Sequence, residues 1–330
     1  MITAPDPALI RAIAVLLGSL VIGSIVRFIA LRKSDPDTRK KRFASLRTWW
    51  MLAILISLGL LGGRLGISVL LGIASCIGWY ELTRMFGPRA QDRVAIKAGY
   101  VIIVLNYLVV ASGSLSLFPG FLPVLSLFVI SISLLARGEP AGYIRSAGAL
   151  LWGLLFLGYG VSHAALLMVL PVTANGPMGP AGWFLFIVIL TETDDIFQAI
   201  TGRLLGAHKR HRIAPVISPN KTWEGFFGGM LVIVILAPLL APWLTTLGQQ
   251  PGPLALPGPL QPLVAPILIA VLVSIAGFFG DINMSAIKRD SGVKDSSRLL
   301  PGMGGVIDRI DSLTMTAPMY VMFLTWWAAA

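Results

Sequence analysis

The chain has 330 residues, of which 56% are hydrophobic and 12% are charged, and its mean hydropathy is +0.82. This composition excludes a soluble globular protein of this size, in which polar and charged residues are more frequent. The net charge of +11 alone would suit a nucleic-acid-binding protein. However, the basic residues are spread between apolar segments instead of forming one patch, so we expect no nucleic-acid partner.

Ten apolar segments follow one another along the chain, and most are long enough to cross a hydrocarbon core about 30 Å thick. The short pair 48–62 and 65–83 fits either a tight hairpin or one re-entrant unit, so the predicted count is nine to ten. The first segment carries Arg11 and Arg27 and has no convincing small-residue cleavage site, which argues against a cleaved signal peptide. The predicted fold is an all-α polytopic integral membrane protein with spans at 8–31, 48–62, 65–83, 98–113, 117–136, 146–170, 181–200, 223–247, 263–284 and 313–329.

Basic residues occur on every second loop. Of the 26 Lys and Arg residues, 23 lie in five regions, at 32–47, 84–97, 137–145, 201–222 and 285–309. The loops between these regions contain only Arg64. The positive-inside rule places the basic loops in the cytoplasm and the N-terminus outside. We therefore expect an integral protein of a bacterial-type cytoplasmic (inner) membrane.

Acidic residues gather in the C-terminal half of the chain. Nine of the fifteen lie within 192–224 or 281–311. We therefore predict two regions, a transmembrane scaffold at 1–180 and a catalytic transmembrane region at 181–330 with its metal and nucleotide site on the cytoplasmic side.

The end of the ninth predicted span combines acids, a hydroxyl and cations. If the helix continues past the membrane boundary, Asp281, Ser285, Lys288 and Arg289 share one face. Oxygen ligands suit Mg²⁺, and Lys and Arg suit phosphate oxygens. A glycine turn follows, Pro301-Gly302-Met303-Gly304-Gly305, where the backbone can approach a partner closely. These residue types predict a site for a metal–phosphate complex.

A second polar region follows the seventh predicted span. Asp195 lies at the cytoplasmic end of that span, and Ser218 and Lys221 precede the eighth. The free backbone N–H groups of a helix N-terminus attract anions, so this segment fits a phosphate cradle. A plain N-cap role for Ser218 or Thr222 is the alternative interpretation.

Together the two regions resemble the phosphatidate cytidylyltransferase (CDP-diacylglycerol synthase) family. The family pattern S-x-x-K-R-x4-K-D-x5-P-G-H-G-G-x-x-D-R-x-D is matched, except at its histidine, by Ser285, Lys288, Arg289, Lys294, Asp295, Pro301, Gly302, Gly304, Gly305, Asp308, Arg309 and Asp311. Its upstream element S-P-x-K-T-x-E-G is matched by Ser218, Pro219, Lys221, Thr222, Glu224 and Gly225. Two departures indicate a divergent branch. Met303 replaces the family's histidine, and Ile196-Phe197-Gln198-Ala199 follows Asp195 where the family has D-S-G-A-Y.

The resemblance implies an enzyme of phospholipid biosynthesis that transfers a cytidylyl group from CTP to phosphatidic acid, giving CDP-diacylglycerol and pyrophosphate. It implies that Asp281 and Asp308 bind Mg²⁺, alone or with a second cation, and that Lys288 and Arg289 are catalytic with them. The implied substrate-binding residues are Ser218, Lys221, Ser285, Lys294, Gly304, Gly305 and Arg309. The residues expected to orient them are Asp195, Glu224, Asp295 and Asp311. CTP would enter from the cytoplasm and the lipid from the inner leaflet. A homodimer is expected by family analogy alone.

The two departures keep other functions open. A CTP-dependent polyprenol or lipid kinase would need a base near its alcohol acceptor, and a cytidylyltransferase with a different acceptor would need a different pocket. A secondary transporter would use the intramembrane acids as ion sites, but gives no reason for the Lys-Arg and glycine spacing. An inactive relative that binds lipid or CTP is a further alternative.

Overall fold

The computed structural model describes residues 7–30, 35–206, 211–249, 252–254 and 258–329. Arg32, Lys33, Lys209 and Arg210, which belong to two of the basic regions, lie outside the described residues. The N-terminal elements are α1 (Pro7–Ala30), α2 (Pro36–Leu61), α3 (Gly63–Met85), η2 (Ala90–Asp92), α4 (Arg93–Ser112), α5 (Phe118–Leu135), α6 (Tyr143–Gly153), the π-helical η3 (Leu154–Gly160) and α7 (Val161–Leu166). The remaining elements are η4 (Pro171–Thr173), α8 (Gly179–Leu205), β1 (Arg212–Ala214), β2 (Ser218–Thr222), α9 (Trp223–Leu244), η6 (Gly258–Leu260), α10 (Gln261–Asp290), α11 (Ile307–Ile310) and α12 (Leu313–Ala328).

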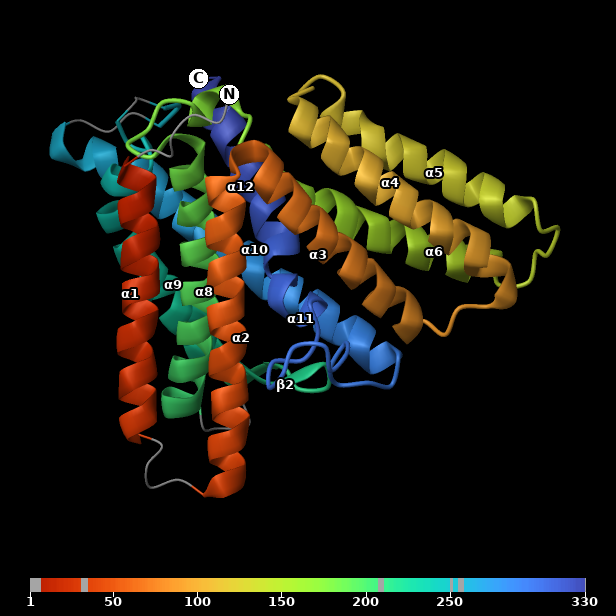
Figure 1. Ribbon diagram of the computed structural model, residues 1–330, viewed down its shortest axis with the longest axis horizontal. Coiled ribbons are helices and arrows are strands. Elements are labelled where there is room, and N and C mark those ends of the chain that lie inside the picture. The colour runs from red at the N-terminus through yellow and green to blue at the C-terminus, as the bar shows by residue number, and fades with distance from the viewer. Residues whose placement is uncertain (1–6, 31–34, 207–210, 250–251, 255–257, 330) are drawn as a thin grey trace.

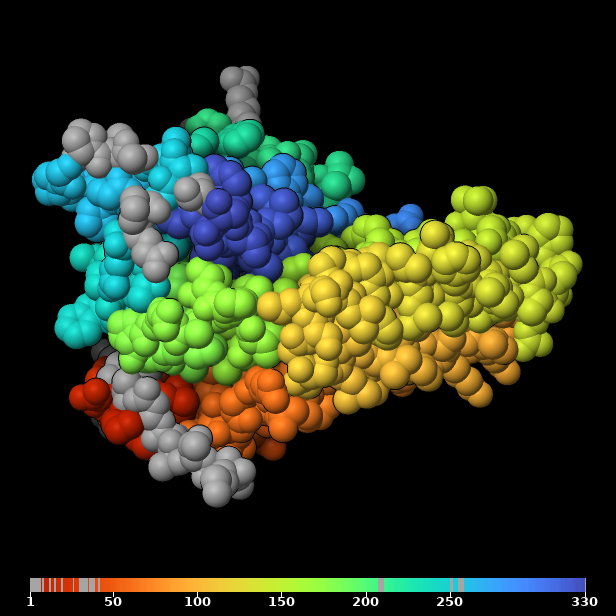
Figure 2. Space-filling model, turned by 90° about the horizontal axis from the view of Figure 1, so that it is seen from above, coloured from red at the N-terminus to blue at the C-terminus, as the bar shows by residue number. Residues whose placement is uncertain are grey.

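The helices form one bundle in which α8, α9, α10 and α12 pack against one another, and α3 to α6 extend from it as a tilted layer (Figure 1). Seen from above, α12 lies beside the segment that joins α7 to α8, with the N-terminal helices on the other side of that segment (Figure 2). The start of α2, the end of α8 and β2 all lie in the lower part of the bundle as drawn in Figure 1. The C-terminal half is therefore in contact with the N-terminal half, and the predicted division at residue 180 stays a prediction.

The expected all-α membrane architecture is confirmed. Among the described residues, eight helices are long and apolar enough to cross a membrane. The seventh predicted span is the helix α8, which is not among these eight because it contains three acids, Glu192, Asp194 and Asp195. The last predicted span is α12, which has only 16 residues and is too short to be counted. The uncertain pair 48–62 and 65–83 forms two separate helices, α2 and α3, which meet at Gly63 with φ of +60°.

The bundle exposes apolar side chains on its outer surface and buries others at its centre. Leu58, Phe128 and Leu239 are among the large hydrophobic side chains that are about 60% exposed or more. This is the distribution expected where lipid tails contact the protein. The core lies around η3, α7, α8 and α12, with fully buried residues such as Phe186 and Tyr320.

A short β-hairpin, which the sequence did not predict, connects α8 to α9. In it β1 pairs antiparallel with β2, and Thr222 caps α9 by accepting a hydrogen bond from the Gly225 backbone N–H at 3.1 Å. Pairing between the two strands provides hydrogen-bond partners for part of the hairpin backbone. The segment around Ser218 is thus a strand that leads directly into a helix N-terminus.

Small residues permit close packing between the two halves of the chain. A Cβ atom added at Gly160 in η3 would overlap the carbonyl oxygen of Thr314, just after the start of α12. Gly148 in α6, by contrast, has nothing within 4 Å of such an atom. Association of helices in a membrane depends on close packing of this kind, because lipid tails are as apolar as the side chains.

We predict that Gly160→Ala will destabilise the folded protein by about 1–3 kcal/mol, since the added methyl group overlaps a backbone carbonyl that cannot move independently. The measurement is the midpoint of thermal unfolding in detergent. Gly148→Ala is the matched control, and because alanine is the better helix former it should leave the midpoint unchanged or raise it. Equal midpoints for the two variants would contradict the close contact between η3 and α12.

Candidate functional site

An ion pair joins the two polar regions of the sequence. The Nζ atom of Lys221, in β2, lies 2.9 Å from Oδ2 of Asp281, in α10. Lys221 also donates a hydrogen bond of 2.9 Å to Oε1 of Gln198, in α8, and lies 5.5 Å from the ring centroid of Phe278. Burial opposes the charged form of Lys221, but the carboxylates of Asp281 and Asp195 outweigh it and raise its pKa. Lys221 of β2 is therefore a cation held by side chains of α8 and α10.

The helix α10 continues beyond the apolar segment to Asp290, as predicted. Ser285 Oγ donates to Asp281 Oδ1 at 3.2 Å, one turn earlier on the same face. Lys288, the next residue on this face, is 8% exposed. Arg289 departs from the expected arrangement, because it is exposed and donates to the backbone oxygens of Ile217 and Val293. The predicted common face therefore holds three of its four residues.

The glycine turn after α10 surrounds the carboxylate of Asp308. Gly302 and Gly304 have φ of +75° and +85°, and a Cβ atom at Gly304 would collide with Asp308 Oδ2. That oxygen accepts hydrogen bonds from Gly305 N at 2.9 Å, Ser296 N at 3.1 Å and Ser296 Oγ at 3.0 Å. The close backbone approach predicted from the glycines is confirmed.

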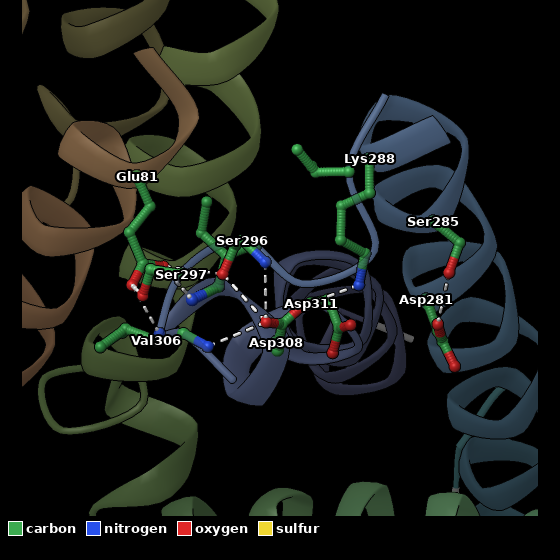
Figure 3. A network of polar contacts seen from close by, with 12 residues as sticks. Glu81, Asp281, Ser285, Lys288, Ser296, Ser297, Val306, Asp308 and Asp311 are labelled. Carbon is green, nitrogen blue, oxygen red and sulfur yellow. Dashed lines mark hydrogen bonds and ion pairs between the residues drawn. The ribbon is translucent and has the colours of Figure 1, made fainter. Parts of the chain in front are cut away.

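The other oxygen of Asp308 binds a cation. Oδ1 lies 2.7 Å from Lys288 Nζ, in an ion pair whose side chains are 8% and 10% exposed (Figure 3). Burial opposes ionisation of Asp308, but the Lys288 ammonium group and the Gly305 amide outweigh it and lower its pKa. Asp308 is thus an ionised group whose oxygens are both engaged within the protein.

Three further carboxylates converge on the same region from different elements. Asp195 comes from α8, Asp281 from α10, and Asp311 from the junction of α11 with α12. Burial, together with the nearby carboxylates of Asp281 and Asp195, raises the pKa of Asp311. Asp195 Oδ2 accepts a hydrogen bond of 2.8 Å from Ser312 Oγ, and Asp311 Oδ1 accepts one of 3.0 Å from Ser312 N. Like charges gathered in this way favour binding of a cation.

Two buried polar atoms beside this cluster have no hydrogen-bond partner within the described structure. They are Oδ1 of Asp195 and Nε of Arg309. A buried polar atom without a partner costs roughly 1–3 kcal/mol, which a bound ligand would recover. The cluster therefore offers both an acceptor for a cation and a donor for an anion.

Mg²⁺ fits the chemistry of these residues. The described residues contain no group of three or more His, Cys, Asp or Glu side chains placed to hold a metal ion. Mg²⁺ does not need such a group, because it is commonly bound by one or two carboxylates together with waters and substrate phosphates. Asp281 and Asp311 are carboxylates of the kind that this mode requires.

Other residues predicted for the site lie at its edge. Lys294 and Asp295 are exposed and form no hydrogen bond or ion pair with the residues that the structure describes. Glu224 pairs with Nδ1 of His211 across the hairpin. Ser218 is at the start of β2, opposite Ala214. The substrate contacts predicted for Ser218 and Lys294, and the orienting roles predicted for Glu224 and Asp295, stay predictions.

The sequence analysis missed Glu81, Gln198 and Ser296. Glu81, in α3, is 2% exposed and binds the loop that carries Asp308. A lone acid inside an apolar span is expensive and usually has a specific partner, so the signal was present. Gln198 links Lys221 to Asp194, to which it donates at 2.8 Å. It lies within the segment that departs from the family pattern.

Sequence comparison finds similar proteins that match most of this chain. The sequence profile of a family described as the cytidylyltransferase family matches residues 43–327. The chain is 33% identical to an uncharacterized protein, YnbB, of Escherichia coli, over 95% of this chain and 97% of that protein. It is 32% identical to a phosphatidate cytidylyltransferase of Brucella abortus, over 78% of this chain and 82% of that protein. A phosphatidate cytidylyltransferase of Chlamydia muridarum is 28% identical over 78% of this chain and 83% of its own length.

We predict that Lys288→Met will destabilise the protein by about 3–5 kcal/mol, because it leaves the buried charge of Asp308 without its partner. The measurement is the midpoint of thermal unfolding in detergent. Arg289→Met is the matched control, because Arg289 is the next residue along the chain and its side chain is exposed. This substitution should shift the midpoint much less. A midpoint for Lys288→Met equal to that of the control would show that the pair does not stabilise the loop.

Proposed function

Because this chain belongs to the cytidylyltransferase family, we propose that it transfers the cytidylyl group of CTP to phosphatidic acid, forming CDP-diacylglycerol and pyrophosphate. The family and the names of the relatives support CTP-dependent cytidylyl transfer. The observation that supports transfer to phosphatidic acid at this site is the ion pair of Lys221 with Asp281. It brings the two polar regions together, so that cations and carboxylates face one another at the end of a membrane bundle.

The reaction joins two polyanions, and the residue types match that task. A phosphate oxygen of the lipid attacks the α-phosphorus of CTP, the bond from that phosphorus to the bridging oxygen breaks, and pyrophosphate leaves. A phosphate monoester is already a nucleophile at neutral pH, so the main work is positioning and neutralisation of charge. We assign Lys221, Lys288 and Arg309 to bind the phosphate oxygens, because the first two are cations beside the carboxylates and Nε of Arg309 has no partner within the described structure.

We assign the cation site to Asp281 and Asp311, with Asp195 beside them. When bound there, Mg²⁺ would neutralise the charge on the phosphates. Asp308, expected from the family resemblance to bind metal, is proposed instead to hold the glycine turn and to orient Lys288, since its two oxygens accept four hydrogen bonds from the protein.

The position of the site supports a location at the inner face of the cytoplasmic membrane. The basic start of α2 lies toward the same end of the bundle as β2, which carries Lys221 (Figure 1). Basic segments of membrane proteins remain on the cytoplasmic side. CTP would then reach the site from the cytoplasm, and the lipid would reach it from the inner leaflet.

One observation favours a second candidate, which is cytidylyl transfer to a different phosphate-bearing acceptor. Gln198 belongs to the segment that departs from the family pattern, and it binds Lys221 directly. A glutamine side chain at this point changes the shape and the hydrogen-bonding groups next to a cation that we place at the phosphates.

The test is an assay of the purified protein in detergent with Mg²⁺, phosphatidic acid and CTP labelled at the α-phosphate. We expect label in the lipid product, and loss of that label when EDTA removes divalent cations. Asp281→Asn should lower the rate by about 100-fold or more, because it removes charge at the cation site and at Lys221. Asp290→Asn, an exposed position at the end of the same helix, is the matched control and should keep the wild-type rate.

The assay also separates the alternatives. If a different phosphate-bearing lipid is labelled and phosphatidic acid is not, that lipid is the acceptor and the proposal of phosphatidic acid is wrong. Transfer of label from CTP labelled at the γ-phosphate to a polyprenol would contradict cytidylyl transfer and favour a kinase. Retention of activity in Asp281→Asn would contradict the assignment of the cation site.

A further inference from the structure

Glu81 is a buried acid of α3 that binds the site loop from the N-terminal half of the chain. Its side chain is 2% exposed in a helix that is otherwise apolar enough to cross a membrane. Its oxygens accept hydrogen bonds from Val306 N at 3.1 Å and Ile307 N at 2.9 Å. They also accept from Ser297 Oγ at 2.5 Å, and Oε2 shares with Asp308 the one proton of Ser296 Oγ, which lies 3.0 Å away. All four donors lie more than 200 positions further along the sequence.

The residues that bind Glu81 are those that surround Asp308. Ser296 Oγ lies 3.0 Å from both Glu81 Oε2 and Asp308 Oδ2, and the Ser296 backbone N–H donates to Asp308. Gly305, whose backbone N–H also donates to Asp308, packs so closely that an added Cβ atom would lie 2.5 Å from each Glu81 oxygen. In Figure 3, Glu81 and Lys288 approach Asp308 from opposite sides. A continuous path of polar contacts therefore runs from Glu81 through Ser296 and Asp308 to Lys288.

A second contact from the N-terminal half holds the same turn. Thr48, in α2, is 2% exposed and donates from Oγ1 to the carbonyl oxygen of Pro301 at 3.0 Å. The turn at 301–305 and the start of α11 are thus fixed by α2 and α3 at two separate points. Because glycines allow this turn many backbone conformations, the external contacts select the one in which Gly305 faces Asp308.

We propose that Glu81 is a positioning residue for the reaction. It acts through the loop at 296–307, which sets the place of Asp308 and hence of Lys288 relative to the phosphates. The expected effect on the reaction rate rests on the proposed function. The expected effect of Glu81 on the position of the loop does not depend on that function. A buried carboxylate is costly in an apolar helix, and here that cost is offset by two amides and two hydroxyls that all belong to one loop. A displacement of about 1 Å at a reacting site can lower a rate about 100-fold.

The test compares Glu81→Gln, Glu81→Asp and Thr48→Val in the full-length protein in detergent. Two quantities are measured for each variant, the hydrogen exchange of backbone amides by mass spectrometry and kcat for transfer from α-labelled CTP. Glu139→Gln is the matched control, because it is the same substitution at an exposed position.

We expect Glu81→Gln to speed exchange in the peptide covering 296–307 by about 10-fold or more, with no change in peptides from α4 and α5. Its kcat should fall by about 10- to 100-fold. Glu81→Asp keeps the negative charge, so its loop exchange and its kcat should lie between those of Glu81→Gln and those of the wild-type protein. Thr48→Val, which removes one hydrogen bond, should have a smaller effect in the same direction.

Two results would overturn the proposal. One is wild-type exchange of the 296–307 peptide and wild-type kcat in Glu81→Gln. The other is faster exchange throughout the bundle, which would make Glu81 a general stabilising residue. If the wild-type protein transfers no label, the proposed function fails. The loop exchange still decides whether Glu81 positions Asp308, because it requires neither CTP nor lipid.

Discussion

The ion pair between Lys221 and Asp281 is the contact on which the arrangement of the site depends. It joins a hairpin that follows α8 to a helix that begins after residue 260, and it brings Gln198 and Phe278 against the same ammonium group. Charges at the end of an apolar bundle are costly unless they are paired. The pair is therefore both a reason for the hairpin to dock on α10 and the means by which two distant polar regions form one site.

The surrounding charges divide into two groups with different roles. Asp308 is engaged with Lys288 and with the backbone of Ser296 and Gly305, so it forms a fixed framework that orients Lys288. Asp311 and Asp195 are held mainly by Ser312, and Asp195 keeps an oxygen without a partner. The oxygens of Asp308 are satisfied by the protein, whereas Asp195 has an oxygen left for a ligand. A site that binds a metal–phosphate complex needs both kinds of group.

The comparison between sequence and structure shows where local patterns suffice. The helix α10 continues past its apolar segment, which was the condition of the prediction, and Ser285 and Lys288 then lie on the face of Asp281 as the helical spacing predicts. The same spacing failed for Arg289, which lies close enough to the hairpin turn to donate to the Ile217 carbonyl instead. Glu81 was assigned to the scaffold because nothing near it in the sequence indicates the loop that it binds.

The sequence by itself determined the membrane class, the order of the helices, the two polar regions and the family resemblance. These depend on hydropathy, on periodicity and on spacing within short segments, all of which are local properties of the chain. Only the tertiary structure decided which carboxylates are already satisfied, which cation faces which acid, and that an acid of α3 holds the turn beside Asp308. Such pairings join residues up to 226 positions apart, and they follow from how the helices pack.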